Sequence, residues 1–164
     1  MEKALPKTSD FKNDICEKYF DMIYKLALSQ TKDQSHAEDV TSDVFLKFLS
    51  SKKDFESEEH IKAWLLRVTI NCSKNVFSNS WFKKTVPLEE TLAAEMPEEE
   101  SEVYAKVLKL PQKYRAVIHL FYYEELSVAQ IAKYLELNES TVRTHLQRGR
   151  SLLKTSLEGE DDFV

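Results

Sequence analysis

The sequence predicts an all-α protein built from two small helical domains. Only two glycines and four prolines occur in 164 residues, which leaves few positions for the tight turns that join β-strands. Apolar residues recur at spacings of three and four, as on the buried face of a helix. A glutamate-rich stretch, residues 85–101, interrupts this pattern and separates residues 1–84 from residues 102–164. We therefore expect two helical domains joined by an acidic linker.

Three helices are expected in the first domain. The first follows Asp10 and presents Ile15, Tyr19, Ile23, Leu26 and Ala27 at helical spacing. The second is expected to start at Ser35, because Ser35 and Glu38 have the spacing of a capping box. Ser57 can cap the third, which fades near residue 79. These helices form one small bundle.

Four helices are expected in the second domain, and the last two form a helix-turn-helix. A helix ending before Pro111 and another around residues 117–121 come first. Ser127 and Gln130 then form a capping box, and after a short break Asn138 is a good N-cap for the final helix. In that final helix the residues at spacings of three and four, which face inward, are Val142, Leu146, Gly149 and Leu153.

The outer face of the final helix carries side chains that suit DNA. These residues are Ser140, Thr141, Arg143, Thr144, Gln147, Arg148 and Arg150. A helical hairpin with solvated arginines is the alternative interpretation. Caps, turn length and the small Gly149 on the packing face agree with the basic outer face, which favours DNA binding.

Charge is unevenly distributed along the chain. The net charge is −5, yet residues 111–157 hold seven Lys or Arg against four Asp or Glu, and residues 85–102 hold seven Glu and no Lys or Arg. Such a chain should bind DNA better when a partner adds contacts or masks the acidic stretch. Without a signal peptide or an apolar run long enough for a bilayer, it is expected to be cytoplasmic, with no membrane insertion.

No catalytic or metal-binding constellation is evident. Cys16 and Cys72 are far apart, and neither has a second Cys or His at the spacing of a zinc site. Glu124 and Glu125 are adjacent and therefore point in different directions on a helix. We expect no enzyme activity, no metal and no cofactor.

The order of these segments resembles the extracytoplasmic-function (ECF) sigma factors of bacterial RNA polymerase. The similarity is carried by HAEDVTSDVFLKFL, then IKAWLLRVTIN, then LKLPQKYRAVIHLFYYEELSVAQIAKYLELNESTVRTHLQRGRSLLK. It implies that residues 1–84 are region 2, which binds the polymerase clamp and the −10 element. It implies that residues 102–164 are region 4, which reads the −35 element. The implied partners are core RNA polymerase through its clamp and flap, promoter DNA and an anti-sigma factor.

The resemblance also implies three sets of site residues. The polymerase-binding set is Glu38, Asp39, Asp43, Val44, Phe45 and Lys47. The set for the −10 strand is Lys52, Lys53, Trp64, Arg67, Asn71, Lys74 and Asn75. The set for the −35 duplex adds Lys154 to the seven outer-face residues named above. Trp64 has a second interpretation, as a core residue.

The chain departs from the family pattern at two places. Ser42 stands where glutamine is usual in the polymerase-binding segment, which affects hydrogen bonding there. After Asn71, Asn75 replaces a common aspartate, and Ser78 and Asn79 replace arginines. The basic tract there is thinner, so melting of the promoter is expected to depend more on polymerase or on a strict −10 sequence.

Two other classes of protein remain open from the residues alone. One is a helix-turn-helix regulator whose first domain senses a ligand or dimerises. The other is a helical adaptor without DNA contact, which the basic final helix disfavours. A sensor domain should show a pocket or a dimer seam, whereas the first domain shows an acidic and aromatic segment.

Overall fold

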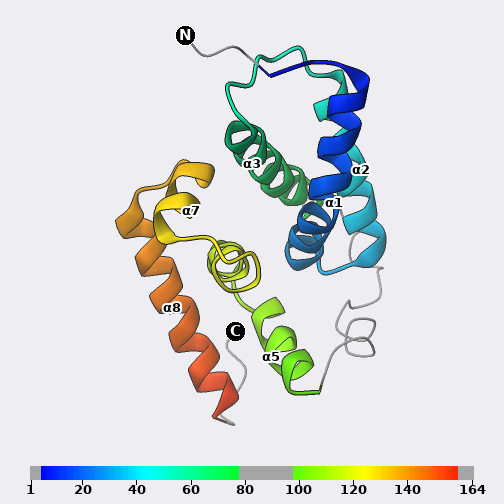
Figure 1. Ribbon diagram of the computed structural model, residues 1–164. Coiled ribbons are helices and arrows are strands. Elements are labelled where there is room, and N and C mark those ends of the chain that lie inside the picture. The colour runs from blue at the N-terminus through cyan, green and yellow to red at the C-terminus, as the bar shows by residue number, and fades with distance from the viewer. Residues whose placement is uncertain (1–4, 78–97, 159–164) are drawn as a thin grey trace.

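The computed structural model describes residues 5–77 and 98–158, which form two helical lobes (Figure 1). The first lobe contains α1 (Ser9–Thr31), α2 (Gln34–Ser50) and α3 (Glu58–Phe77). The second contains α5 (Glu98–Leu108), α6 (Gln112–Ile118), the π-helical turn η2 (His119–Tyr123), α7 (Val128–Leu135) and α8 (Glu139–Leu157). No strand occurs within the described ranges, and the predicted all-α class is confirmed.

Helix ends in the first lobe are set by side chains that satisfy free backbone groups. Thr8 accepts a hydrogen bond from the Phe11 amide at the start of α1 (3.2 Å), and Ser57 accepts from the His60 amide at the start of α3 (3.1 Å). At the end of α2, the Lys12 ammonium donates to the Leu49 and Ser51 carbonyls (3.2 and 2.9 Å). The predicted role of Ser57 is confirmed.

The start of α2 differs from the prediction. Asp33, not Ser35, is the N-cap: its carboxylate accepts from the His36 amide (2.8 Å) and contacts the His36 ring. A carboxylate that bonds the backbone and the ring together holds the chain in one conformation, and Ser35 is left exposed. The helix therefore begins at Gln34, one residue earlier than expected.

The helix-turn-helix forms as the sequence predicts. The Ser127 hydroxyl accepts from the Gln130 amide (3.1 Å), and the Gln130 side chain accepts from the Ser127 amide (2.9 Å), which completes the capping box. α7 ends at Leu135, with Glu136 as its C-cap in the left-handed conformation (φ 58°), and α8 begins after Asn138. Asn138 is the N-cap by position but makes no side-chain cap hydrogen bond.

Gly149 allows α8 to approach α6 closely. A Cβ at this position would lie 2.9 Å from Cγ1 of Ile118, which is itself buried. A larger side chain must therefore displace a packed residue, at a typical cost of about 1–3 kcal/mol that exceeds the helix-propensity gain of roughly 0.5–1 kcal/mol on replacing glycine.

We expect Gly149→Val to lower the midpoint of thermal unfolding relative to the wild type. The matched control is Ser151→Ala, an exposed position on the same helix. Calorimetry of both variants measures the effect. Equal midpoints for Gly149→Val and the wild type would contradict the packing role of this glycine.

The end of the linker also differs from the prediction. Residues 98–101 were expected to be linker, but α5 already begins at Glu98. The substitutions at Ser78 and Asn79, and residues 78–97 in general, lie outside the described part of the chain.

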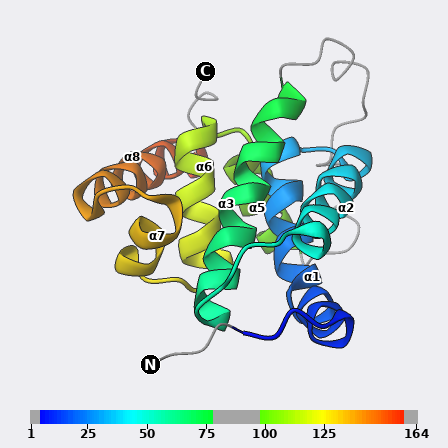
Figure 2. The ribbon, with the colours of Figure 1, turned by 90° about the horizontal axis from the view of Figure 1, so that it is seen from above.

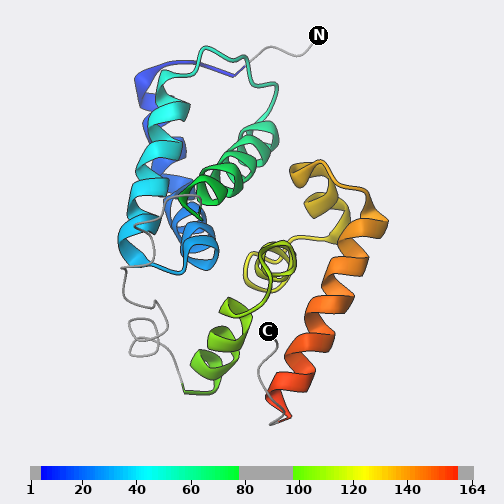
Figure 3. The ribbon, with the colours of Figure 1, turned by 180° about the vertical axis from the view of Figure 1, so that it is seen from behind.

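The two lobes are packed against each other. α3 lies beside α7, and α1 contacts α6, as the views in Figures 2 and 3 show. Arg115 of α6, only 3% exposed, donates to the Leu110 carbonyl (2.6 Å) in its own lobe and to the Gln30 carbonyl (3.3 Å) of α1. Burial lowers the pKa of Arg115 to about 10, so the group stays charged at neutral pH.

Within residues 5–77 and 98–158, no helix is both long and apolar enough to cross a bilayer.

Candidate nucleic-acid interface

The basic face of α8 is open to solvent. Val142 and Leu146 are buried against the rest of the lobe, together with Gly149, and this orients the opposite face outward. On that face Ser140, Arg143, Gln147, Arg148 and Lys154 are exposed, and Thr141 and Thr144 are half-buried. Seven of the eight residues expected at the −35 duplex thus lie on one accessible surface, and none of the seven is buried in the core.

Arg150, the eighth residue of that set, is engaged within the protein. Its Nε donates to the Tyr122 hydroxyl (2.5 Å), and its guanidinium lies over the Phe121 and Tyr122 rings (5.4 and 5.5 Å to the centroids). These contacts direct Arg150 toward the side of α8 that faces η2. Arg143, by comparison, has a weak ion pair with Glu139 (3.6 Å), one turn earlier on the exposed surface.

An aromatic cluster supports the loop between α2 and α3. Phe55 is buried, and the Trp64 ring packs on Phe48 and Phe55 with centroids 6.1 and 5.8 Å away. Trp64 is half-buried, so it packs on the core and still presents part of its ring at the surface. Lys52 and Lys53 are exposed on the loop, and the Lys53 ammonium lies over the Phe55 ring, 6.0 Å from its centroid. A cationic loop over an aromatic ring is a suitable arrangement for an unstacked base.

Further along α3, the residues expected at the −10 strand face the second lobe. Arg67, Asn71 and Lys74 line a cavity of about 250 Å³ whose other wall includes Gln112, Leu137 and His145. The Arg67 guanidinium donates to the Glu136 carboxylate at 2.8 Å. Asn75, the last of the set, is exposed and lies instead in a hollow beside Asp39 and Asp43 of α2.

The polymerase-binding set divides between the surface and the core. Glu38, Asp39, Asp43 and Lys47 are exposed, but Val44 is 0% exposed and Phe45 is 7% exposed. Phe45, expected in the polymerase-binding set, is therefore not exposed for direct contact with a partner, and its ring stacks on that of Phe20 in α1.

Leu46 and Leu49 are exposed apolar residues on α2 that were not predicted from the sequence as part of a binding surface. They are 64% and 40% exposed, and they follow Asp39 and Asp43 at helical spacing along the same face. The signal was present in the sequence, because the buried positions Val40, Val44 and Phe48 place Leu46 on the opposite side of the helix.

Cys72 lies beneath this face and is buried. Its thiol contacts the Asp43 carboxylate (3.4 Å) and the Lys47 ammonium (3.5 Å). Burial raises the pKa of the Cys72 thiol, with a smaller opposing effect from Lys47. Among the described residues, no three His, Cys, Asp or Glu side chains gather as metal ligands.

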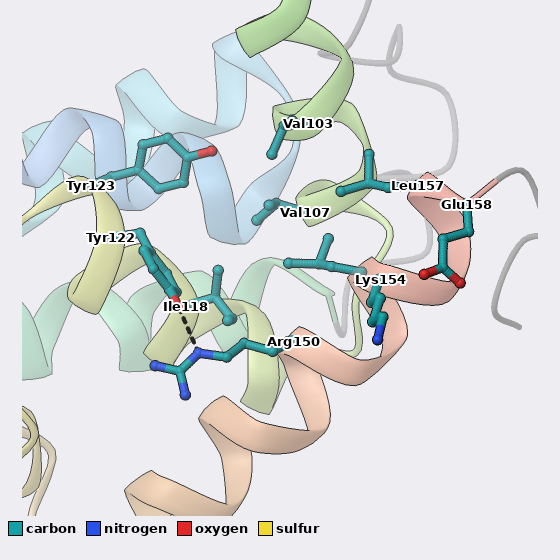
Figure 4. Close-up of a pocket in the computed structure, with 10 residues that line it drawn as sticks. Val103, Val107, Ile118, Tyr122, Tyr123, Arg150, Lys154, Leu157 and Glu158 are labelled. Carbon is teal, nitrogen blue, oxygen red and sulfur yellow. Dashed lines mark hydrogen bonds between the residues drawn. The ribbon is translucent and has the colours of Figure 1, made fainter.

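A large apolar groove lies on the second lobe, between α5, η2 and α8 (Figure 4). Its volume is about 590 Å³. Its walls are Val103, Val107, Ile118, Tyr122, Tyr123, Arg150, Leu153, Lys154, Leu157 and Glu158. Tyr122 and Leu157 are each about half exposed, at 49% and 51%. An apolar groove with charged residues at its edge is suited to an amphipathic helix of another protein.

This geometry defines a class of protein: a two-lobed, all-helical factor with a helix-turn-helix whose last helix has an exposed basic face. Comparison with known families makes the class specific. Residues 15–82 match the family model of sigma-70 region 2, and residues 100–153 match that of sigma-70 region 4.

Curated relatives agree with the two family matches. The ECF RNA polymerase sigma factor SigW of Bacillus subtilis is 26% identical over 166 residues, covering 88% of this chain and 87% of SigW. The RNA polymerase sigma factor SigV of the same organism is 29% identical over 143 residues, covering 84% and 86%. The chain belongs to the extracytoplasmic-function sigma factors of bacterial RNA polymerase.

Two solved structures share the fold. CnrH, in complex with the cytosolic domain of CnrY, matches with a TM-score of 0.74 at 21% identity, over 94% of this chain and 92% of that one. The sigma factor RpoE of Bartonella quintana, in complex with the anti-sigma factor NepR, matches with a TM-score of 0.65 at 18% identity, over 92% and 98%.

Proposed function

We propose that this sigma factor directs promoter-specific initiation by reading the −35 element as duplex with α8 and the −10 element as single strand with the α2–α3 loop and α3. In this proposal residues 1–84 are region 2, residues 85–101 the acidic linker and residues 102–164 region 4. The single observation that carries it is the exposed basic face of α8, held outward by buried Val142 and Leu146. A helix so placed can enter the major groove and bring side chains to base edges.

Residues near the start of α8 read the bases. Arg143, Thr144, Gln147 and Arg148 lie in its first three turns, where a helix inserted into the groove approaches the bases most closely. Ser140, Thr141 and Lys154 lie at the ends of this surface and contact phosphates, which set register and affinity but carry no sequence information. Arg150 supports the helix through Tyr122.

The −10 strand runs across the α2–α3 loop. Lys52 and Lys53 supply charge for the backbone, and the exposed part of Trp64 supplies a ring for base stacking. Arg67, Asn71, Lys74 and Asn75 continue this polar path along α3. The −10 strand can occupy this path once the second lobe has moved away from α3.

Core polymerase binds at two surfaces. The exposed face of α2, with Asp39, Asp43, Leu46 and Leu49, meets the clamp, so that apolar contacts are surrounded by acidic ones. The groove between α5, η2 and α8 receives a helix of the flap. An anti-sigma factor is the remaining partner, as NepR is in the RpoE complex, and it competes with polymerase for these surfaces.

A pull-down with purified core polymerase subunits tests this function against the helix-turn-helix regulator, which is the alternative. We expect the tagged full-length chain to retain the core enzyme and the isolated β′ clamp fragment at stoichiometric levels. A regulator would bind duplex DNA but no polymerase subunit. Failure to retain core enzyme under conditions in which a known sigma factor retains it would contradict the proposal.

A further inference from the structure

Two segments that are far apart in the sequence lie side by side at one end of the first lobe (Figures 1 and 3). Residues 5–12, which we call the strap, lead into the first turn of α1, and residues 51–57 form the α2–α3 loop. The Leu5 amide donates a hydrogen bond to the Phe55 carbonyl (3.0 Å). The space left between the strap and the loop measures only about 10 Å³, so the two segments are in close contact.

Two lysines of the strap hold the backbone of the α2–α3 loop. The Lys7 ammonium donates to the Lys52 carbonyl (2.8 Å) and is paired with the Asp54 carboxylate (2.5 Å). In the first turn of α1, the Lys12 ammonium donates to the Ser51 carbonyl (2.9 Å). Together with the backbone bond at the other end of the loop, three loop carbonyls accept hydrogen bonds from the strap.

The backbone bond at Phe55 fixes the aromatic part of the proposed −10 surface. The Phe55 side chain is buried, and its ring packs edge-on against the Trp64 ring with a centroid distance of 5.8 Å. The Lys53 ammonium lies over the same Phe55 ring. A shift of this backbone would therefore move both the cation and the ring that the strand is proposed to meet.

The strap also changes the charge that the loop presents. Two lysines within residues 51–57 are balanced by Asp54 and Glu56. A carboxylate beside the phosphates of a strand would oppose binding. The ion pair with Lys7 offsets the charge of Asp54, although both side chains are exposed and solvent screens the pair.

We propose that the strap sets the conformation of the α2–α3 loop for capture of the −10 strand, with Lys7 as a positioning residue. This inference rests on the proposed function, which assigns the loop to the −10 strand. Ordering a loop costs conformational entropy, and contacts formed before the strand arrives leave less of that cost to the binding step. Lys7 acts through the Lys52 carbonyl and the Asp54 carboxylate and does not itself contact a base.

Replacement of Lys7 tests the proposal in the full-length chain. Lys7→Ala removes the hydrogen bond and the ion pair, and Lys7→Arg should keep both, because a guanidinium also donates to carbonyl and carboxylate oxygens. The matched control is Lys25→Ala. Lys25 is exposed further along α1 and is paired with Asp21 (2.9 Å), so this variant loses the same charge and an exposed ion pair away from the loop.

The first measurement is hydrogen exchange of the backbone amides of residues 51–57 in the free chain. We expect exchange in Lys7→Ala to be roughly two- to tenfold faster than in Lys25→Ala, the effect of one hydrogen bond and one exposed ion pair. Lys7→Arg should exchange at the wild-type rate. Equal rates in Lys7→Ala and Lys25→Ala would overturn the strap, and this result does not depend on DNA.

The second measurement is the base preference of holoenzyme in selections from single-stranded DNA randomised over the −10 region. Lys7→Ala should reduce the preference at the captured base by roughly two- to tenfold, whereas Lys7→Arg and Lys25→Ala should keep it. A lysine that bound phosphate directly would instead weaken binding to all sequences alike and lower the salt slope by about one unit. That result, or an unchanged preference in Lys7→Ala, would overturn the positioning role.

The wild-type chain in the same selections separates failure of the strap from failure of the proposed function. A wild-type base preference that Lys7→Ala retains would overturn the strap alone. Wild-type holoenzyme without any base preference among these strands would overturn the proposed −10 reading, and the inference that rests on it.

Discussion

Alanine at Arg143 or Arg148 relaxes base preference at one or two positions of the −35 element. Both arginines are exposed near the start of α8, and a bidentate contact between arginine and guanine contributes about 1–3 kcal/mol to discrimination. The expected loss of preference is therefore roughly 5- to 150-fold at the affected base pair. Binding selections with holoenzyme, over duplexes randomised in the −35 region, measure it for each variant.

The matched variant for this experiment is Lys154→Ala, also exposed on α8 but placed for a phosphate. It should weaken binding to all sequences alike and reduce the salt slope by roughly one unit. Preferences identical to the wild type in both Arg143→Ala and Arg148→Ala, with the fold intact by circular dichroism, would show that α8 does not read the bases.

Reversing one charge and removing one apolar side chain on α2 should weaken binding to core polymerase. The variant combines Asp39→Lys with Leu46→Gln, both at exposed positions whose substitution leaves the core intact. Loss of the leucine burial that the complex provides is alone worth about 1.5–3 kcal/mol, so affinity should fall by roughly 10- to 150-fold. Fluorescence titration of core enzyme with labelled chain measures the dissociation constant.

Asp14→Lys is the control for this second experiment, because it adds the same charge on an exposed part of α1. Its affinity for core enzyme should equal that of the wild type. The assignment of the α2 face to the clamp fails if the double variant also binds core enzyme as tightly as the wild type does.

Local sequence signals were sufficient to predict helix caps and buried helix faces where a single pattern was present. Ser127 and Gln130 cap α7 as predicted, and Val142, Leu146 and Gly149 are the buried side of α8. The start of α2 offers two candidate N-caps, Asp33 and Ser35. Asp33 is the N-cap, because its carboxylate bonds both the His36 amide and the His36 ring. Phe45 was assigned to the polymerase-binding set by the family resemblance, although its spacing of three from Phe48 puts it on the buried side of α2.

Contacts between the lobes had no local signal. Arg67 and Glu136 are 69 residues apart, and Glu59 and Tyr134 are 75 apart, so no periodicity or motif relates them. The π-helical turn η2 also has no local sequence signal. Its residues His119 and Leu120 are buried, and it has no side-chain cap. The sequence alone therefore predicts which surfaces carry DNA-compatible residues, but not that the two lobes cover one of them.

The most direct test of the central claim is transcription in vitro with purified core polymerase over a library of promoters randomised at the −35 and −10 regions. We predict that adding this chain produces transcripts from templates that share two fixed elements at one spacing, and that core enzyme alone produces none from them. Transcript profiles that are the same with and without the chain would contradict its action as a promoter-specific sigma factor.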